Sequence, residues 1–162
     1  MATHQMAMLG ALPKAAAYFA PIYRIRLVRD GRQSMIARQM TGPVEAATVL
    51  RAYLQGGDRE YFVVMLLDVR CRVIGINTVS IGTLDSSIVS GREVFKAAIL
   101  TNANSIILGH NHPSGDPQPS PSDITVTRDL VKAGKVLDIK VQDHIIIGEG
   151  GQHLSLKERG FM

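Results

Sequence analysis

A continuous apolar run, Tyr61 to Leu67, limits the folds open to this chain more than any other feature. The run has seven residues, whereas a helix that spans a bilayer needs roughly 18 to 20 apolar residues. No other stretch comes closer to that length, so no membrane segment is expected. An unbroken apolar run of this length predicts a buried, central strand of a sheet.

Strands and helices alternate along the main part of the chain. Asp68 to Arg72 predicts a turn, and Val73 to Ser80 predicts a second strand antiparallel to the first. The other expected elements are a helix from Pro43 to Gly56-Gly57 with Val44, Ala47, Leu50 and Leu54 inside, a helix capped by Ser90 with Val94, Ala97 and Ala98 inside, a strand over 105–108, a helix from Pro121 to Lys132 stopped by Gly134, and strands over Val136–Val141 and His144–Ile147. The predicted class is α/β or α+β with a mixed sheet.

The N-terminal part differs from the rest in pattern. Apolar Tyr23, Ile25 and Leu27 alternate with arginines, which predicts a half-buried strand. Asp30-Gly31 is a hairpin turn signal, and Gln33 to Ala37 would form the returning strand. We therefore expect a basic β-hairpin extension over residues 1–41 and a main domain over 42–162.

The positive charge of the chain is concentrated in this extension. The formal net charge is +4, and only Asp30 opposes the nearby arginines, which are Arg24, Arg26, Arg29, Arg32 and Arg38. Such a patch attracts nucleic acid or an acidic protein surface, and it is also typical of a solvated strand face. With 46% hydrophobic and 20% charged residues the composition is globular. The single cysteine excludes an intrachain disulfide, and the N-terminus has no basic region of a secretory signal, so a cytoplasmic protein is expected.

The segment GHNHPSGDPQPSPSD, residues 109–123, carries the chemistry. His110 and His112 leave the end of a predicted strand two residues apart, so both side chains point to one side and can converge on a metal ion. The loop can return Asp123 from the first turn of the next helix as a third ligand. Two histidines and one carboxylate leave one position of a tetrahedral Zn²⁺ open, which is typical of a catalytic site.

Simpler explanations exist for the same residues. Ser120-x-x-Asp123 before a helix is also a capping arrangement, with Pro121 at the first helical position. A His-x-His pair also occurs by chance in surface loops, and Asp116 belongs first of all to a Gly-Asp-Pro turn. His144, next to Asp143, could support a metal ligand or lie in a turn between strands. The order of strand, His-x-His-Pro, loop and Ser-x-x-Asp favours the metal site.

His-x-His-Pro followed by Ser-x-x-Asp resembles the JAMM motif of JAB/MPN-domain metallopeptidases, and the longer string HNHPSGDPQPS resembles the RadC family. Similar segments are Asp58–Phe62, Gly82–Asp85, Arg92–Phe95 and Asp143–Gly148, so the resemblance covers roughly residues 42–162. It implies a zinc-containing, cytidine-deaminase-like three-layer sandwich with a curved mixed β-sheet between helices. Two features depart from the family: Gly91 replaces a usual proline, and the expected basic hairpin stands where longer members have a helix-hairpin-helix DNA-binding module.

The resemblance also implies roles for individual residues. His110, His112 and Asp123 match the zinc ligands, and Glu60 matches the general acid/base that acts on the metal-bound water. Ser120 matches the residue that helps to hold the oxyanion. Without the resemblance, Glu60 would be taken for a solvated strand end.

The resulting functional hypothesis is a zinc metallopeptidase that hydrolyses a peptide or isopeptide bond in a protein or peptide substrate. The main alternative is a DNA-associated accessory protein, in DNA repair or a mobile element, in which Arg24, Arg26, Arg29 and Arg32 contact phosphates without sequence preference. A third hypothesis keeps the metal and makes the protein a nuclease.

Overall fold

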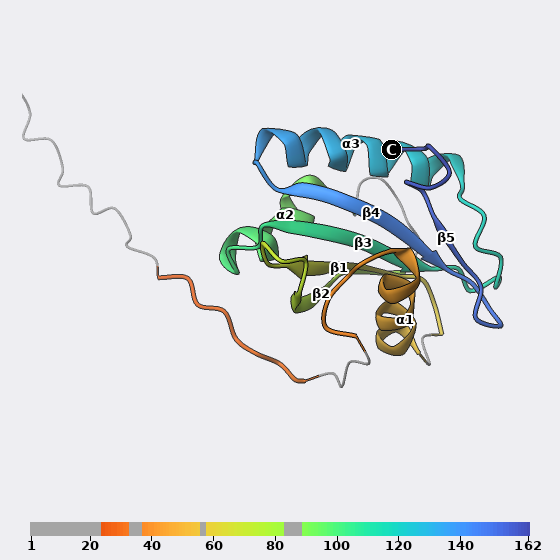
Figure 1. Ribbon diagram of the computed structural model, residues 1–162, viewed down its shortest axis with the longest axis horizontal. Helices are drawn as coiled ribbons and strands as arrows, with labels where there is room; N and C mark the ends of the chain where they lie inside the picture. Colours follow the sequence, from red (N-terminus) through yellow and green to blue (C-terminus); the bar gives the residue numbers. More distant parts are fainter. Residues whose placement is uncertain (1–23, 33–36, 56–57, 83–88) are drawn as a thin grey trace, which may run out of the picture.

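The computed structural model describes residues 24–32, 37–55, 58–82 and 89–162. Its elements in chain order are α1 (Pro43–Leu54), β1 (Tyr61–Leu67), β2 (Val73–Ile81), α2 (Gly91–Leu100), β3 (Ser105–Asn111), α3 (Pro121–Val136), β4 (Lys140–Ile147) and β5 (His153–Ser155). The strands form one sheet in the order β2-β1-β3-β4-β5 (Figure 1). Only β3 and β4 are parallel, and the other neighbours are antiparallel. The sheet is therefore mixed, as predicted.

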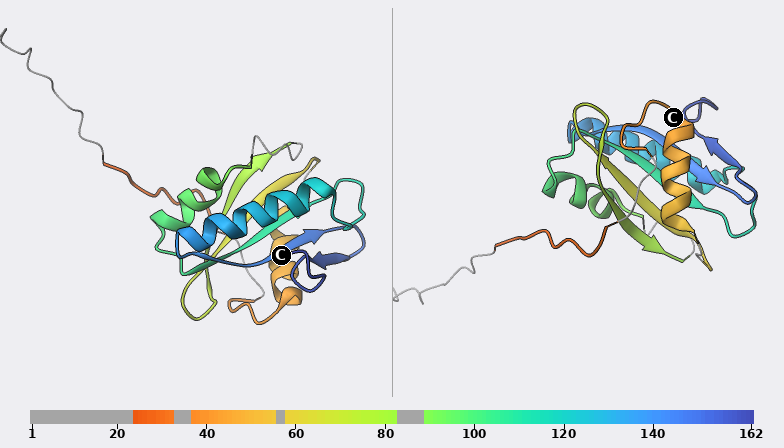
Figure 2. Two further views of the ribbon diagram at one scale, coloured as in Figure 1. Left: turned by 90° about the horizontal axis from the view of Figure 1, so that it is seen from above. Right: turned by 60° about the horizontal axis from the view of Figure 1, so that its bottom comes forward.

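The sheet lies between two layers of helices. Helices α2 and α3 cover one face and α1 covers the other (Figures 1 and 2). Successive residues of β1 alternate between two hydrophobic clusters: Phe62, Val64 and Leu66 join one, and Val63, Met65 and Leu67 join the other. Tyr61 to Leu67 is thus a central strand buried on both faces, and the prediction of a three-layer α/β sandwich is confirmed.

Helix α1 begins at Pro43, as the sequence predicts, but its buried face is rotated from the predicted one. Ala46, Ala47, Val49, Leu50 and Leu54 are buried, whereas Val44 is 60% exposed. The first turn of the helix therefore faces solvent on the side that Val44 occupies. The predicted stop at Gly56-Gly57 lies outside the described residues. Helix α2 has Ser90 at its N-cap, although the Ser90 side chain makes no capping hydrogen bond.

Two predictions for the C-terminal part are wrong. Gly134 does not stop α3, which continues to Val136, and residues 140–147 form one strand instead of two. Gly134 lies where the chain turns back towards β4: a Cβ atom there would lie 2.5 Å from the carbonyl oxygen of Ile139. The glycine is therefore required by close packing inside the helix. The short strand β5 was not predicted.

The N-terminal extension is only partly described. Residues 24–32 contain no helix or strand and all are exposed, so the strand predicted over Tyr23–Leu27 is not formed in its described part. Tyr23 and residues 33–36 lie outside the described residues. Nearer to α1, the amide of Met40 donates to the Cys71 carbonyl (2.9 Å) and the amide of Val73 donates to that of Arg38 (2.9 Å). These bonds attach residues 38–40 to the start of β2.

No helix in the described part of the chain is long and apolar enough to cross a membrane.

Candidate metal centre

The candidate metal centre lies where β3 ends and α3 begins. His110 is in β3, His112 follows the strand by one residue, and Asp123 lies in the first turn of α3. Glu60 precedes β1, the antiparallel neighbour of β3. One potential ligand atom from each of these four residues lies within 4.8 Å of the other three. The structure therefore brings four of the five predicted site residues together in one group that could hold a metal ion.

The distances among the three predicted ligands suit a zinc ion. The Nε2 atoms of His110 and His112 are 2.9 Å apart, and each lies 3.5 Å from an oxygen of Asp123. Zn–N and Zn–O bonds near 2.0–2.2 Å place two ligands of a tetrahedral ion about 3.3 Å apart. The triad is close to that spacing.

A chain of hydrogen bonds determines which ring nitrogen of His110 carries the proton. The Thr127 hydroxyl donates its only proton to the Asp123 carbonyl (2.6 Å), so it accepts from Nδ1 of His144 (2.5 Å). Nε2 of His144 is then unprotonated and accepts from Nδ1 of His110 (2.8 Å). In the neutral ring, Nε2 of His110 is left with its lone pair directed at the centre. A hydrogen bond to the other ring nitrogen is the usual way in which proteins orient a metal-binding histidine.

His112 is oriented in the same way by a backbone group. Its Nδ1 donates to the carbonyl oxygen of Asp116 (2.7 Å), so Nε2 carries the lone pair in the neutral ring. Asp116 therefore acts through its backbone, and its side chain accepts from the amide of Gln118. In the neutral rings the two Nε2 atoms that face each other at 2.9 Å are thus both acceptors, and a metal ion or a proton between them would relieve their repulsion.

The charges at the site favour such a cation. The hydrogen bond with Asp123 raises the pKa of His112 above its usual value. Burial raises the pKa of Asp123, but the hydrogen bonds with His112 and with Ser120 outweigh burial and hold the pKa well below its usual range. Asp123 is therefore a carboxylate at neutral pH, although it is only 2% exposed.

His110 and His144 are neutral, because burial lowers both pKa values. The pKa of His110 is well below the usual value, and that of His144 falls to about 4. Both rings are fully buried and pack against Phe62 of β1, with ring centroids 6.1 and 5.4 Å away. A neutral imidazole is the form that binds a metal.

Asp123 caps α3 while it faces the histidines. Its Oδ2 accepts from the Ser120 amide and hydroxyl (both 2.7 Å), and its own amide donates to the Ser120 hydroxyl oxygen (3.1 Å). The capping box and the metal triad therefore coexist. The proton of the Ser120 hydroxyl is used by Asp123 in this structure, so the role of Ser120 towards an oxyanion stays a prediction.

Sequence reasoning did not assign the supporting residues His144 and Thr127. The split of residues 136–147 into two strands left His144 open as a turn residue. In the structure it lies inside β4, opposite Leu108 of β3. Its place directly before three isoleucines is a signal that could have identified it, because a polar side chain buried at the start of such a run needs a hydrogen-bond partner.

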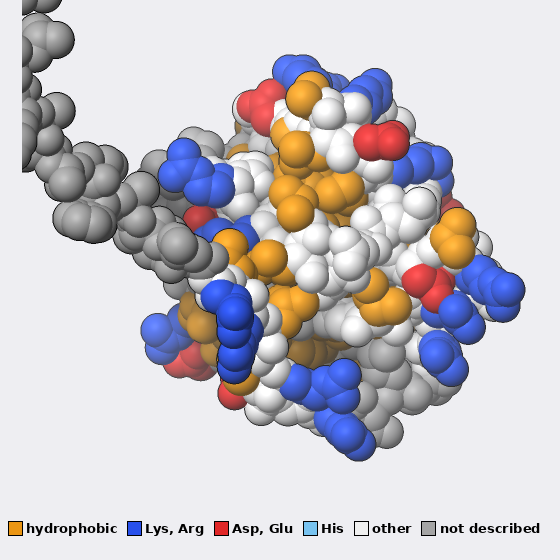
Figure 3. All heavy atoms as spheres, turned by 90° about the vertical axis from the view of Figure 1, so that its left-hand side faces the viewer, with side chains coloured by type: hydrophobic (Ala, Val, Ile, Leu, Met, Phe, Trp, Pro, Cys, Tyr) orange, Lys and Arg blue, Asp and Glu red, His pale blue; other side chains and the backbone are white. Residues whose placement is uncertain are grey.

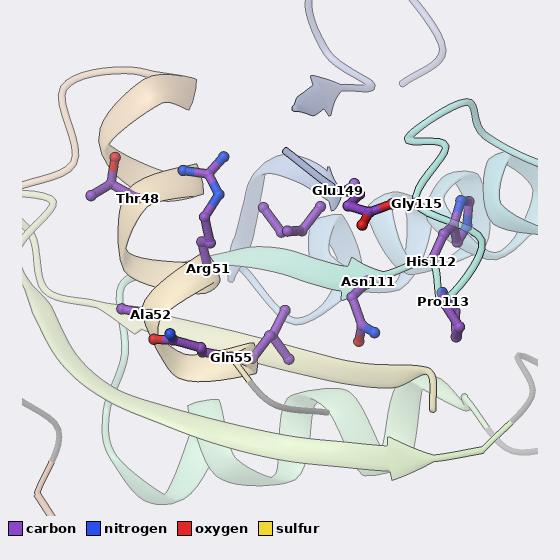
Figure 4. Close-up of a pocket in the computed structure, with 12 residues that line it drawn as sticks. Thr48, Arg51, Ala52, Gln55, Asn111, His112, Pro113, Gly115 and Glu149 are labelled. Atoms are coloured by element: carbon purple, nitrogen blue, oxygen red, sulfur yellow. The ribbon is translucent and has the colours of Figure 1, made fainter. Parts of the chain in front are cut away.

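A cavity of ≈ 740 Å³ opens beside His112, on the side of the sheet that α1 covers. Figure 4 shows Thr48 and Arg51 of α1, with Gln55 just after the helix, on one side of it and Asn111, His112 and Pro113 on the other. The Arg51 guanidinium donates to the carbonyl of Gly151 (2.6 Å). His112, one of the candidate metal ligands, therefore lines this cavity.

A histidine pair at the end of a strand, joined by a loop to a helix that supplies an aspartate and set within a three-layer sandwich, is typical of a JAB-type domain. The family model described as RadC-like JAB domain matches residues 40–161, and the chain belongs to this family.

Named relatives support the assignment. The UPF0758 protein TTE0897 of Caldanaerobacter subterraneus is 49% identical over 139 residues, which cover 83% of this chain and 59% of that protein. UPF0758 proteins of Chloroflexus aggregans and Methanosarcina mazei are 51% and 44% identical over 118 and 125 residues, covering 73% and 77% of this chain and 51% and 54% of their own lengths. The chain thus spans between about half and three-fifths of these relatives.

Proposed function

We propose that this chain is a zinc-dependent hydrolase of peptide or isopeptide bonds. The observation that carries the proposal is the position of Glu60: its carboxylate lies within 4.8 Å of the ligand atoms of His110, His112 and Asp123. A structural zinc site is closed by four protein ligands, commonly with several cysteines. Two imidazoles and one carboxylate beside a further carboxylate fit a catalytic site better.

Each residue has a task in such a reaction. A bound zinc ion would lower the pKa of a water molecule and polarise the carbonyl group of the substrate. Glu60 takes a proton from the attacking water as its oxygen bonds to the carbonyl carbon, and then gives that proton to the leaving amine nitrogen. Ser120 would help to hold the developing oxyanion, which requires its hydroxyl proton to move from Asp123 to the substrate oxygen.

The experiment compares Glu60→Gln with His110→Ala/His112→Ala. We expect wild type and Glu60→Gln to hold about one zinc per chain, and the double histidine variant to hold none. In a panel of peptide-linked and isopeptide-linked fusion substrates, Glu60→Gln should be slower by about 10²- to 10⁴-fold. Glu158→Gln, at an exposed position, is the matched control. Equal zinc content in all variants would refute the site, and wild-type turnover by Glu60→Gln would refute its role.

A second proposal is DNA association through the N-terminal arginines. It is favoured by the exposure of Arg24, Arg26, Arg29 and Arg32, none of which forms an ion pair within the described residues. Figure 3 shows Lys and Arg side chains around the edge of one side of the molecule. Exposed, unpaired arginines are available to phosphates, and binding through them would be indifferent to base sequence.

A further inference from the structure

Asn111 lies between the two histidines, yet its side chain is directed at a different strand. Its Oδ1 accepts from the amide of Tyr61 (2.9 Å), and its Nδ2 donates to the carbonyl of Arg59 (2.9 Å). These two groups belong to the residues on either side of Glu60. One amide side chain therefore holds the peptide groups that flank the proposed acid/base.

These bonds occur where the regular pairing of the strands ends. The ladder between β1 and β3 runs from Leu67 opposite Ser105 to Phe62 opposite His110. Beyond that pair, the Asn111 side chain supplies the contacts that a backbone would supply inside the ladder. On the other side, the carbonyl of Glu60 accepts from the amide of Gly82 (2.8 Å) at the end of β2. The backbone of Glu60 is thus tied to elements on both sides.

The chemistry of the two bonds selects asparagine. One partner is a donor and the other an acceptor, and both are backbone groups at fixed positions. A carboxamide presents an acceptor and a donor from one short side chain. Aspartate offers no donor when ionised, and leucine, which has a similar shape, offers neither.

We propose that Asn111 is the positioning residue of Glu60: it fixes the start of β1 so that the Glu60 carboxylate faces the metal ligands. This inference rests on the proposed function for the chemical role of Glu60, but the positioning itself does not depend on the substrate. Asn111 has no task in holding the metal, because both of its side-chain partners lie on the β1 side.

The test uses Asn111→Leu, Glu60→Ala and the double variant in the full chain, loaded with Co²⁺ in place of zinc. The visible spectrum of Co²⁺ reports the geometry and the neighbours of its ligands. We expect Asn111→Leu to bind about one metal ion per chain, as its ligands are intact, and to shift the cobalt spectrum as Glu60→Ala does. The double variant should add no further shift, because both changes remove the same interaction. Asn104→Leu, the same substitution at an exposed position just before β3, should leave the spectrum unchanged.

Amide hydrogen exchange gives a second, metal-independent readout. The Tyr61 amide should exchange at least about tenfold faster in Asn111→Leu, because it loses its acceptor. If that variant does not fold, Asn111→Asp keeps the acceptor for Tyr61 but loses the donor to Arg59; Tyr61 should then stay protected while the cobalt spectrum moves towards that of Glu60→Ala.

The outcomes separate this inference from the proposed function. A cobalt spectrum that changes in Glu60→Ala but not in either Asn111 variant would overturn the positioning role alone. A spectrum that does not change in Glu60→Ala would place Glu60 away from the metal and overturn both proposals. Additive shifts in the double variant would show that Asn111 acts on the metal by another route, which also overturns the inference.

Discussion

At the scale of single residues, Thr127 controls the proton positions of two histidines. Its hydroxyl donates to one backbone carbonyl and accepts from His144, which in turn orients His110. In Thr127→Val the Nδ1–H group of His144 loses its acceptor inside the core. We expect a loss of about 1–3 kcal/mol in the free energy of unfolding and a zinc affinity about 10- to 100-fold weaker.

Chemical denaturation and zinc titration against a chelator measure both quantities. The matched control is Thr125→Val: Thr125 is also bonded to the carbonyl four residues before it, but it is exposed. Equal zinc affinity in the two variants would refute the orienting role of Thr127.

The buried histidines also make the stability of the metal-free protein depend on pH. Burial lowers the pKa of His110 and of His144, the latter to about 4, so the folded state binds fewer protons than the unfolded state below the ordinary histidine pKa near 6.5. Stability should therefore fall as the pH drops from about 6.5 to 4, by up to about 1.4 kcal/mol per pH unit for each histidine.

His112 acts in a separate pH range. Asp123 raises the pKa of His112. The stabilisation that His112 contributes to the folded state is therefore fully present below the ordinary histidine pKa and is lost as the pH rises through the raised pKa. The free energy of unfolding of the metal-free protein, measured with denaturant between pH 4 and 8, should have its maximum at about pH 6.5. Constant stability from pH 6.5 down to 4 would contradict the neutral, buried state of His110 and His144.

The site residues differ in how far the sequence could predict them. His110, His112 and Asp123 come from one segment, so strand geometry and the following helix were enough to expect their convergence. Glu60 and His144 reach the site only through strand pairing, β1 with β3 and β3 with β4. Local spacing carries no information about that pairing, and Glu60 was assigned only through the family resemblance.

At the scale of elements, helix propensity and close packing have opposite effects on a substitution of Gly134 by alanine. Alanine inside a helix is favoured over glycine by about 1 kcal/mol. A Cβ atom at this position, however, would lie 2.5 Å from the Ile139 carbonyl oxygen and 3.2 Å from the Phe95 ring. Backbone cannot move aside as a flexible side chain can, so we expect Gly134→Ala to lower the free energy of unfolding by about 1–2 kcal/mol.

Thermal and denaturant unfolding test this expectation. Gly91→Ala, whose added Cβ would lie 3.6 Å from the Ala133 side chain, is the control and should be neutral or stabilising. If Gly134→Ala were the more stable of the two variants, the turn between α3 and β4 would have to be looser than the structure shows.

The same glycine explains why the predicted end of α3 is wrong. A glycine near the end of an apolar pattern is usually a helix stop, and only the tertiary contact with Ile139 shows that this one lies inside the helix. The central strand could be predicted from the hydrophobic pattern of 61–67, because that pattern depends on burial alone, whereas the layer order was expected only through the family resemblance. The exact ends of α3 and β4 depend on contacts between elements that are distant in the sequence.

At the scale of the whole molecule, the N-terminal arginines lie on a segment apart from the metal centre and can be tested separately. Each phosphate contact adds roughly 0.9 to the slope of log affinity against log salt. We expect the replacement of Arg24, Arg26, Arg29 and Arg32 by Gln to weaken DNA binding equally for all sequences and to flatten that slope, with zinc content unchanged.

A variant with the same loss of charge elsewhere is the control. It replaces the exposed residues Arg92, Lys96, Lys132 and Lys135 of α2 and α3 by Gln. Binding isotherms at several salt concentrations distinguish the two variants. If wild type does not bind DNA at about 50 mM salt, or if the control loses as much affinity, the proposal of a DNA contact through the N-terminal segment is refuted.

Asp123 both caps α3 and faces the two histidines of the metal centre. Position 123 should therefore tolerate almost no substitution. Asparagine can accept the Ser120 hydrogen bonds and cap α3, but it lacks the charge that faces His112. Glutamate can complete a capping box, but its extra methylene displaces the carboxylate from two rings that are held rigidly by other bonds. Each alternative keeps one role of Asp123 and loses the other. In a library that samples all residues at this position, selection for folding alone should retain Asn and Glu, whereas selection for metal binding should retain Asp alone.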